Sequence, residues 1–242
     1  MKILDINTDM GEYPEFLKNG LYENLMDYVT TINVACGGHA GNKHLMERIV
    51  KIARTKKVNI GAHPGYPDRD NFGRIDLKIE PNHLLITITN QIQMLRKIAE
   101  DQGITLSHVK VHGALYNRAT RDKMIAQIIG EAVLKVNPRL TVIGLAGSIM
   151  VDAFTNMGLK VIEEAFADRT YDMNGCLSSR TFRNALITDP KKAAIQAKLI
   201  SKGKIIALDG SELDIKAQTI CIHSDTPHAL AIAKEVHTAM NK

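Results

Sequence analysis

The sequence has few of the residues that mark several common classes of protein. Its three cysteines, at positions 36, 176 and 221, form no CxxC pair among 242 residues. An odd number of widely spaced cysteines predicts neither a disulfide framework nor a paired-cysteine zinc site. The chain also has no Trp and only 5 Phe, which leaves little aromatic surface on which nucleic-acid bases could stack.

Long apolar runs and segregated charges are missing too. No apolar stretch approaches ~18 residues, and the first residues resemble a strand rather than a signal peptide. We therefore expect a soluble, cytoplasmic protein that binds no membrane. The formal charge is +5, but acids interrupt the basic residues, and the dense run 54–57 ends a predicted helix. This distribution argues against nucleic-acid binding.

The composition, with 45% hydrophobic and 24% charged residues, is that of a folded globular chain. Short apolar runs alternate with segments of helical periodicity, the order that is typical of a parallel sheet covered by helices. We predict one catalytic domain over residues 1–242, because barrels of this type often reach about 250 residues. The runs that predict strands are 3–7, 32–35, 58–62, 109–111, 140–145, 159–162 and 219–222, with 205–208 ambiguous.

Capping residues and apolar spacing predict the helices. Ser148, the pair Asp189-Pro190 and the pair Thr226-Pro227 have the side chains that begin helices. Apolar periodicity predicts further helices at 21–29, 45–53, 84–102 and 124–136. The polar segment 163–189 has little periodicity, which favours a long loop over a functional site.

Five predicted strands end in side chains that can move protons or hold a polar ligand. The segments are 7–12, 35–41, 61–66, 110–117 and 221–225. Because parallel strands point their carboxyl ends at one face, these ends predict a single site, and their number favours a closed barrel over an open sheet. No strand is followed by a GxGxxG or GxxxxGK[ST] motif, so we expect no standard nucleotide-binding loop in this chain.

Asp9 and Glu12 are the first candidate catalytic residues. Asp9 is interpreted as following its strand in a glycine-containing turn, either as a base that orients water or as a turn-capping residue. If the two carboxyl groups lie close together, one of them should have a raised pKa and serve as the acid.

His63, Lys110 and His112 also lie at predicted strand ends. Lys110 and His112 are two residues apart and share a strand face, and a buried lysine needs an anionic partner or ligand. We expect these two side chains to contact a carboxylate, a phosphoryl group or a developing oxyanion, with Tyr116 and Asn117 as further donors. For His63, a purely structural role is the alternative.

The segment after the sixth predicted strand contains Asp168, a catalytic candidate, and Arg169. Arg169 suits capture of a substrate carboxylate, although an ion pair within a long loop is an equally good interpretation. Arg74 is a second candidate for anion binding. The predicted substrate-binding set is completed by Asn7, His39 and His223.

Seven motifs together resemble one known family. They are NTDMGE (7–12), ACGGHAG (35–41), GAHPGYPD (61–68), FGR (72–74), KVHGALYN (110–117), FADRTYD (166–172) and HSD (223–225). In this order and spacing they are similar to the LamB/YcsF family, which provides one component, the A component, of prokaryotic 5-oxoprolinase. The resemblance implies a TIM-like α/β barrel of about seven parallel strands, related to carbohydrate deacetylases.

The resemblance also implies a function and partners. It implies a hydrolase that opens a cyclic amide, 5-oxo-L-proline, to L-glutamate with ATP and with separate subunits B and C. Because this chain shows no nucleotide motif, we expect ATP to be bound by the partners and an activated substrate to reach this chain. Two departures from the family pattern are Gly38, where Phe is usual, and 178–180, where Ser-Ser-Arg replaces Val-Pro-Arg. The first is expected to loosen a pocket wall.

Two alternatives use the same residues. In a metal-dependent amidohydrolase or deacetylase, a divalent ion held by Asp9, His63, His112 and His223 would activate water. No HxH or HExxH pair supports this set locally. The other alternative is a subunit that binds a metabolite without catalysis.

Overall fold

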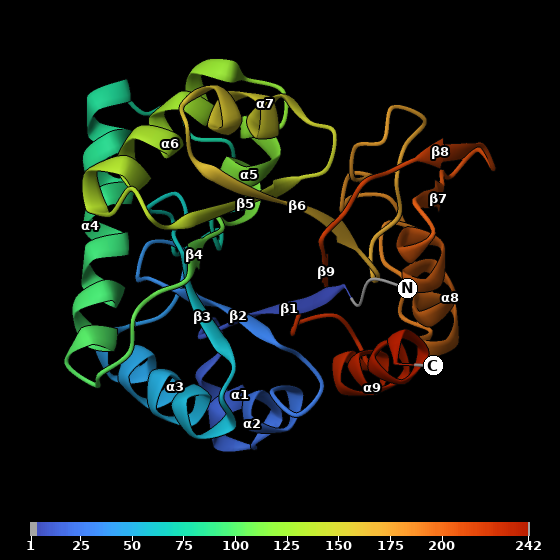
Figure 1. Cartoon of the computed structure of the whole chain (residues 1–242), viewed down its shortest axis with the longest axis horizontal. Helices are drawn as coiled ribbons and strands as arrows, with labels where there is room; N and C mark the ends of the chain where they lie inside the picture. The colour runs from blue at the N-terminus through green and yellow to red at the C-terminus, as the bar shows by residue number, and fades with distance from the viewer. Residues whose placement is uncertain (1–3, 242) are drawn as a thin grey trace.

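The computed structural model describes residues 4–241, and its centre is a closed barrel of parallel strands (Figure 1). The order around the barrel is β1-β2-β3-β4-β5-β6-β9, so six consecutive strands are closed by the last one. This is a TIM-like α/β barrel with seven strands, as predicted. The strands are β1 Asp5–Met10, β2 Thr31–Ala35, β3 Asn59–His63, β4 His108–Val109, β5 Thr141–Leu145, β6 Lys160–Phe166 and β9 Thr219–Cys221.

Two strands run three or four residues further than predicted, and both differences change the site. β1 extends to Met10, so Asp9 lies within the strand and not in a turn after it. β6 extends to Phe166, so the predicted loop begins four residues too early. The polar pair Glu163-Glu164 hid this continuation, because a strand inside a polar barrel does not need apolar residues. Ile3, the predicted start of the first strand, lies outside the described residues. The prediction that Lys110 lies on a strand was wrong, because β4 ends at Val109 and Lys110 and His112 follow it.

Helices surround the barrel (Figure 1), and their apolar side chains are buried in one core with those of the strands. In α3, for example, Leu45, Met46 and Ile49 are buried, whereas charged residues face outward. The helices are α1 Pro14–Lys18, α2 Leu21–Leu25, α3 Lys43–Lys56, α4 Pro81–Glu100, α5 Gly113–Ala119, α6 Lys123–Val136, α7 Ile149–Asn156, α8 Pro190–Ser201 and α9 Ala229–Met240.

Of the three residues predicted to cap a helix with their side chains, one does so and two do not. Asp189 accepts hydrogen bonds from the amides of Lys191 and Lys192 at the start of α8, as expected. The prediction for Thr226 was wrong, because α9 begins at Ala229 and the Thr226 hydroxyl donates to Asp168 instead. Ser148 precedes α7, but its hydroxyl donates to the carbonyl oxygen of Leu145 and caps nothing.

The ambiguous run 205–208 belongs to a small hairpin outside the barrel. Strands β7 Lys204–Ile206 and β8 Glu212–Asp214 pair antiparallel beside α8 (Figure 1). The hairpin is therefore an insertion between α8 and β9. It does not interrupt the parallel order of the barrel.

Polar side chains fill much of the barrel interior. Asn7, Asn33, His108, Lys110 and Glu164 are all at most 3% exposed. Gly61 makes room for one of them, since a Cβ atom there would lie 2.1 Å from Nε2 of His108. His108 thus reaches across β3 to Asn33, with 2.7 Å between its Nε2 and the amide oxygen.

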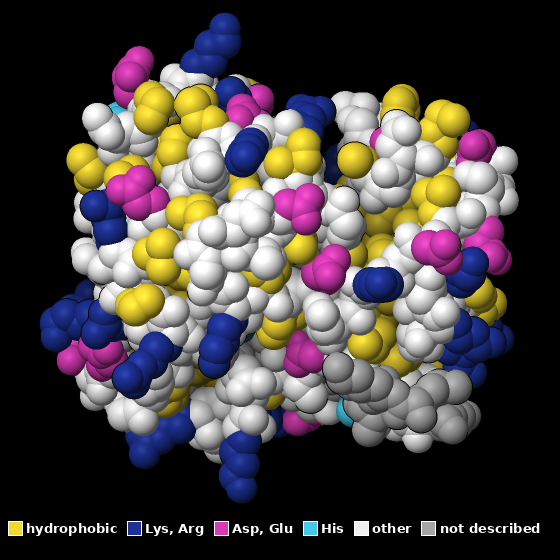
Figure 2. All heavy atoms as spheres, turned by 45° about the horizontal axis from the view of Figure 1, so that its top comes forward, with side chains coloured by type: hydrophobic (Ala, Val, Ile, Leu, Met, Phe, Trp, Pro, Cys, Tyr) yellow, Lys and Arg dark blue, Asp and Glu magenta, His cyan; other side chains and the backbone are white. Residues whose placement is uncertain are grey.

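The outer surface carries mixed charges. On the face drawn in Figure 2, Lys and Arg side chains are interspersed with Asp, Glu and apolar ones. Within residues 4–241, none of the helices combines the length and apolar character that crossing a bilayer requires.

Candidate active site

The carboxyl ends of the strands open into a pocket of about 990 Å³. Asp9, from β1, and His63, from β3, lie at this end with Lys110 and His112, which follow β4. The predicted polar loop contributes residues 172–174 and 176–182 to the pocket wall. The pocket brings together nine predicted site residues: Asp9, His63, Arg74, Lys110, His112, Tyr116, Asn117, Arg169 and His223.

Lys110 is the centre of one buried group, the Lys110 cluster, which consists of Asn7, Asp9, Lys110, Glu164 and Cys221. Its Nζ atom lies 2.9 Å from Oε1 of Glu164 and 3.2 Å from Oδ1 of Asp9. The same nitrogen lies 3.3 Å from Oδ1 of Asn7 and 3.1 Å from Sγ of Cys221. The anionic partner predicted for Lys110 is therefore supplied by the protein itself.

Neighbouring charges shift the pKa values of the groups in the Lys110 cluster. Burial lowers the pKa of Lys110, but Asp9 and the other acidic neighbours outweigh it and raise the pKa well above its usual value. Burial raises the pKa of Asp9, whereas His63 and Lys110 lower it, and the net pKa is below its usual value. For Glu164, burial dominates and the pKa is raised. Asp9 and Lys110 are consequently both charged at neutral pH.

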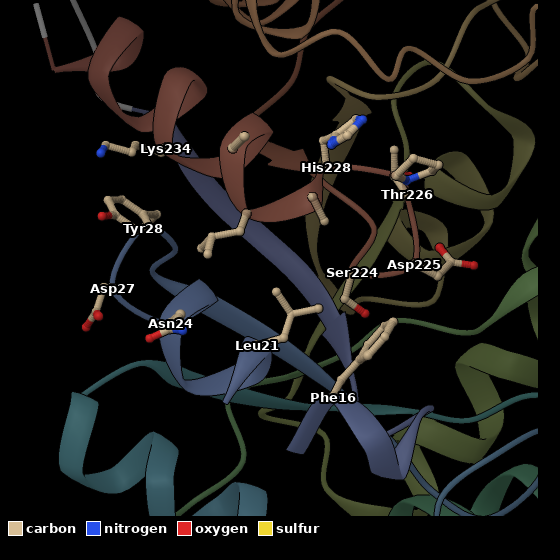
Figure 3. Close-up of a pocket in the computed structure, with 14 residues that line it drawn as sticks. Phe16, Leu21, Asn24, Asp27, Tyr28, Ser224, Asp225, Thr226, His228 and Lys234 are labelled. Atoms are coloured by element: carbon tan, nitrogen blue, oxygen red, sulfur yellow. The ribbon is translucent and has the colours of Figure 1, made fainter. Parts of the chain in front are cut away.

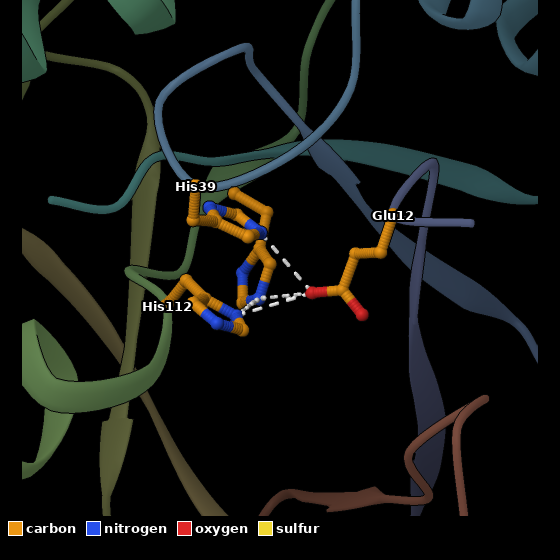
Figure 4. Close-up of side chains that lie close together, drawn as sticks. Glu12, His39 and His112 are labelled. Carbon is orange, nitrogen blue, oxygen red and sulfur yellow. Dashed lines mark hydrogen bonds and ion pairs between the residues drawn. The ribbon is translucent and has the colours of Figure 1, made fainter. Parts of the chain in front are cut away.

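A second buried group, the Glu12 cluster, consists of Glu12, His39, His63 and His112. Figure 4 shows His39 and His112 pointing at the same carboxylate, with 3.1 Å from Oε1 of Glu12 to Nε2 of His39 and 3.1 Å to Nδ1 of His112. Nε2 of His63 lies 3.0 Å from Nδ1 of His112 and 3.8 Å from the same Oε1. Sequence positions 12, 39, 63 and 112 thus meet around one oxygen atom.

Two histidines of the Glu12 cluster, His39 and His63, are hard to protonate. Burial lowers the pKa of His63 to about 3 and that of His39 to about 4. Burial raises the pKa of Glu12, but hydrogen bonds with His112 and His39 outweigh it and lower the pKa well below its usual value. The expectation that Asp9 or Glu12 has a raised pKa was therefore wrong. The carboxyl group with the raised pKa is Glu164.

Asp168 holds a loop in place. Its Oδ2 accepts hydrogen bonds from the His223 amide at 2.9 Å and the Thr226 hydroxyl at 2.6 Å, and Nδ1 of His223 is 3.1 Å away. Arg169 donates to the carbonyl oxygens of Ala185 and Ser178. Asp168 and Arg169 thus point to different partners, so the ion pair considered between them is not formed.

The remaining predicted residues differ in their access to the pocket. Glu12, His39, Asn7 and Asp168 are buried and lie behind the residues that line it. Tyr116 lines the pocket, but its hydroxyl donates to Oε2 of Glu164 at 2.9 Å. Arg74 lies at the rim, where it pairs with Asp225. The predicted metal set is divided, because His223 lies with Asp9 and Cys221, whereas His63 and His112 lie with Glu12.

Gly38 does not loosen the pocket wall. A Cβ atom at this position would lie 2.4 Å from Oε1 of Gln91, whose side chain bonds both backbone groups of Gly65. The space that a larger residue would need at position 38 is therefore filled from α4.

Two residues of the site, Glu164 and Asn33, are not among those predicted from the sequence. Glu164 is fully buried between Lys110, Asn7 and Tyr116. Asn33, from β2, contacts the Lys110 cluster by donating to Oδ1 of Asp9 at 2.8 Å. The apolar residues 165–167 after Glu164 were the signal that its strand continues. Nothing local distinguishes Asn33 from another strand residue, because its partners come from other strands.

A second hollow lies beside α9 and has a different character. It has a volume of about 820 Å³ and is mostly apolar, with Phe16 and Leu21 facing the start of α9 (Figure 3). Asp225 borders it, but the members of the Lys110 and Glu12 clusters do not. We therefore take the pocket at the carboxyl ends of the strands, and not this hollow, as the candidate active site.

Comparisons with known proteins show the family to which the chain belongs. The model of the LamB/YcsF family matches residues 4–242. A protein of Bacillus licheniformis that is named as the A component of 5-oxoprolinase is 43% identical over 98% of this chain and 94% of its own length. A protein of Haemophilus influenzae with the same name is 39% identical over 100% of this chain and 97% of its own length.

Solved structures show the same likeness. The crystal structure of the lactam utilization protein from Thermus thermophilus matches with a TM-score of 0.91 and 37% identity, over 100% of this chain and 96% of that one. The 3-deoxy-D-arabino-heptulosonate 7-phosphate synthase from Thermotoga maritima matches with a TM-score of 0.52 at 10% identity, over 98% of this chain and 85% of that one. The second likeness concerns the barrel fold alone.

Proposed function

The chain belongs to the LamB/YcsF family, and from this premise we propose that it is the component of an ATP-dependent 5-oxoprolinase that opens 5-oxo-L-proline to L-glutamate. The observation that carries the proposal is the pocket over Asp9 in a chain that matches 5-oxoprolinase components along nearly their whole length. The deacetylase alternative has less support, because the relatives that match at 39–43% identity are named for 5-oxoprolinase.

The reaction sets clear requirements. A five-membered lactam is a stable amide, so its hydrolysis at neutral pH needs an activated carbonyl, a positioned water and a proton for the leaving nitrogen. Asp9 lines the pocket as an ionised carboxylate, and its Oδ1 is fixed by Lys110 and Asn33. Its Oδ2 lies 3.5 Å from Nε2 of His63.

We assign to Asp9 the orientation of the attacking water. The water oxygen forms a bond to the ring carbonyl carbon, its proton passes to Asp9, and the carbon–nitrogen bond breaks. The ring nitrogen then takes up the proton and becomes the amine of glutamate. Arg74, Arg169 and Arg180 line the pocket wall, where a guanidinium group can bind the carboxylate of the substrate.

The proposal includes ATP and partner subunits because the lactam is a stable amide that needs activation. An activated ring carbonyl would be opened more easily than the free lactam. If ATP phosphorylates the carbonyl oxygen, attack by water and cleavage of the carbon–nitrogen bond give an acyl phosphate, and a second water then releases L-glutamate and inorganic phosphate. The sequence has no nucleotide-binding motif, so we propose that subunits B and C bind ATP and activate the substrate.

An assay of glutamate formation tests this division of labour. The chain would be incubated with 5-oxoproline and ATP, alone and with candidate B and C subunits from the same organism. We expect glutamate only from the complete mixture. Glutamate formation by this chain alone would contradict the division of labour, and no glutamate from the complete mixture with correctly folded subunits would contradict the reaction itself.

A further inference from the structure

We infer that Glu12, His63 and His112 form a binding site for one divalent transition-metal ion, of which zinc is the model. The inference concerns ion binding and stands apart from the reaction proposed above. It rests on the positions of the hydrogen atoms in the Glu12 cluster, which the surrounding carbonyl groups determine.

Two backbone carbonyls fix the hydrogens of two imidazole rings. Nδ1 of His63 lies 2.7 Å from the carbonyl oxygen of Lys110, and Nε2 of His112 lies 3.0 Å from that of Phe72. A carbonyl oxygen only accepts hydrogen bonds, so both of these nitrogens carry hydrogen. In neutral imidazoles, Nε2 of His63 and Nδ1 of His112 are then bare.

The bare atoms face one another. Nε2 of His63 and Nδ1 of His112 are 3.0 Å apart, and the ionised Glu12 oxygen completes a triangle with them at 3.8 and 3.1 Å. Three lone pairs directed at one space repel each other unless a cation lies between them. A point about 2 Å from all three atoms exists in this triangle, and that is the length of zinc–nitrogen and zinc–oxygen bonds.

Within residues 4–241, the chain supplies Glu12 with no permanent cation. The ion-pair contacts of Glu12 are with imidazoles, and its side chain is 3% exposed. A buried carboxylate requires a compensating charge. A proton held between these three atoms is the competing occupant. A divalent ion satisfies all three lone pairs at once.

His39 is a positioning residue in this arrangement. Its ring stacks on that of His112 with 3.6 Å between centroids and 3° between planes. Imidazole lone pairs lie in the ring plane, so one ion cannot lie in both planes. His39 instead holds Glu12 through Nε2. The ring of His63 is at 86° to that of His112 and meets no such conflict.

The surroundings have the features of a metal site with an open position. Phe72 adopts a left-handed backbone conformation with φ 56°, which is unusual for a large side chain, and its carbonyl oxygen orients His112. His63 and His112 line the pocket, so the ion would be reached from there. The other group of possible ligands, Asp9, Cys221 and His223, has Lys110 bonded to Asp9 and Cys221. An ammonium group already occupies the place of an ion there.

Metal uptake by the purified full chain tests the inference. Protein stripped with a chelator and dialysed would be titrated with Zn²⁺, and its bound metal and thermal midpoint measured. We expect one ion per chain and a midpoint that rises with zinc concentration. X-ray absorption of the zinc-loaded wild type should show two imidazole ligands at about 2.0–2.1 Å. A folded wild type that takes up no ion would mean a bound proton only, and would overturn the inference.

Variants separate the ligands from their neighbours. Glu12→Gln, His63→Gln and His112→Gln should each lose the ion, whereas Cys221→Ser should keep it unchanged. His39→Gln should keep one ion per chain with an affinity about 10- to 100-fold lower, as for other residues that orient ligands. Full retention by His63→Gln, or complete loss in a folded His39→Gln, would overturn the ligand assignment. If a variant does not fold, the absorption spectrum of the wild type decides alone.

Discussion

Two buried polar clusters lie next to each other below the pocket, and they differ in the source of their positive charge. In the Lys110 cluster, an ammonium group of the chain lies between the carboxylates of Asp9 and Glu164. In the Glu12 cluster, a carboxylate faces the three imidazoles of His39, His63 and His112, none of which is a permanent cation. The first cluster is complete as folded, whereas the second is complete only with a cation from outside.

The two clusters show that one barrel core can contain both side chains that stabilise the fold and side chains that remain available to a ligand. Lys110 has hydrogen-bond acceptors on every side, so it fixes Asp9 and does not need a ligand. His63 and His112 are held by carbonyl groups on one side only. Their other nitrogens are directed at the space below the pocket. We therefore expect substitutions in the Lys110 cluster to affect folding most.

The largest effect should follow removal of the internal cation. Lys110→Met leaves Asp9 and Glu164 buried without their partner, and loss of one member of a buried pair costs about 3–5 kcal/mol. Urea unfolding of the variant and the wild type measures the difference. Adding Glu164→Gln to Lys110→Met should restore part of the stability. A stability unchanged by Lys110→Met would show that the cluster does not depend on its cation.

Asp9→Asn tests the part of the Lys110 cluster that opens into the pocket. It keeps the shape of the side chain but removes the charge that accepts a proton, so glutamate formation by the complete subunit mixture should fall about 100-fold or more. Asp5→Asn is the matched control on the same strand, where Asp5 bonds Thr31 and Thr219 at the other end of the barrel. We expect it to lose stability but retain activity. Equal activity losses in both variants would point to a general structural effect.

His108 makes the Lys110 side of the core sensitive to acid. Burial lowers the pKa of His108 to about 4, from an unfolded value near 6.5. The unfolded chain therefore binds a proton that the folded chain rejects between these pH values, and stability is lost as the pH falls from about 6.5 towards 4, by up to about 3 kcal/mol. Unfolding at several pH values measures this slope. His108→Gln should make this slope shallower but not flat, because burial also lowers the pKa of His39 and His63 and these two histidines keep their share of it. An unchanged slope in the variant would show that His108 does not contribute.

The smallest effect should come from the pocket rim, outside both clusters. Arg74 pairs with Asp225, and its side chain is 40% exposed. Exposed ion pairs contribute about 0–1 kcal/mol, so Arg74→Ala should change stability by no more than that. If Arg74 binds the substrate carboxylate, the variant should raise KM and leave kcat nearly unchanged. Loss of kcat with an unchanged KM would speak against this role.

The sequence alone was sufficient for the barrel and for most of the pocket. Apolar runs of strand length alternate with amphipathic helices, and this local pattern determines seven parallel strands. Because such strands end at one face, the acids, histidines and lysine at their ends could be assigned to one site. The motifs of the LamB/YcsF family lie at these same strand ends.

Only the tertiary structure decided how these residues are partnered. Lys110 and Asp9 are 101 positions apart, and Asn7 and Glu164 are 157 apart, so barrel closure and strand register determine whether they touch. The same holds for the hydrogens of His63 and His112, which depend on carbonyl groups that a folded loop and strand present. The order of strands and helices is determined by local sequence, but exact strand ends, charges and hydrogen positions depend on contacts across the barrel.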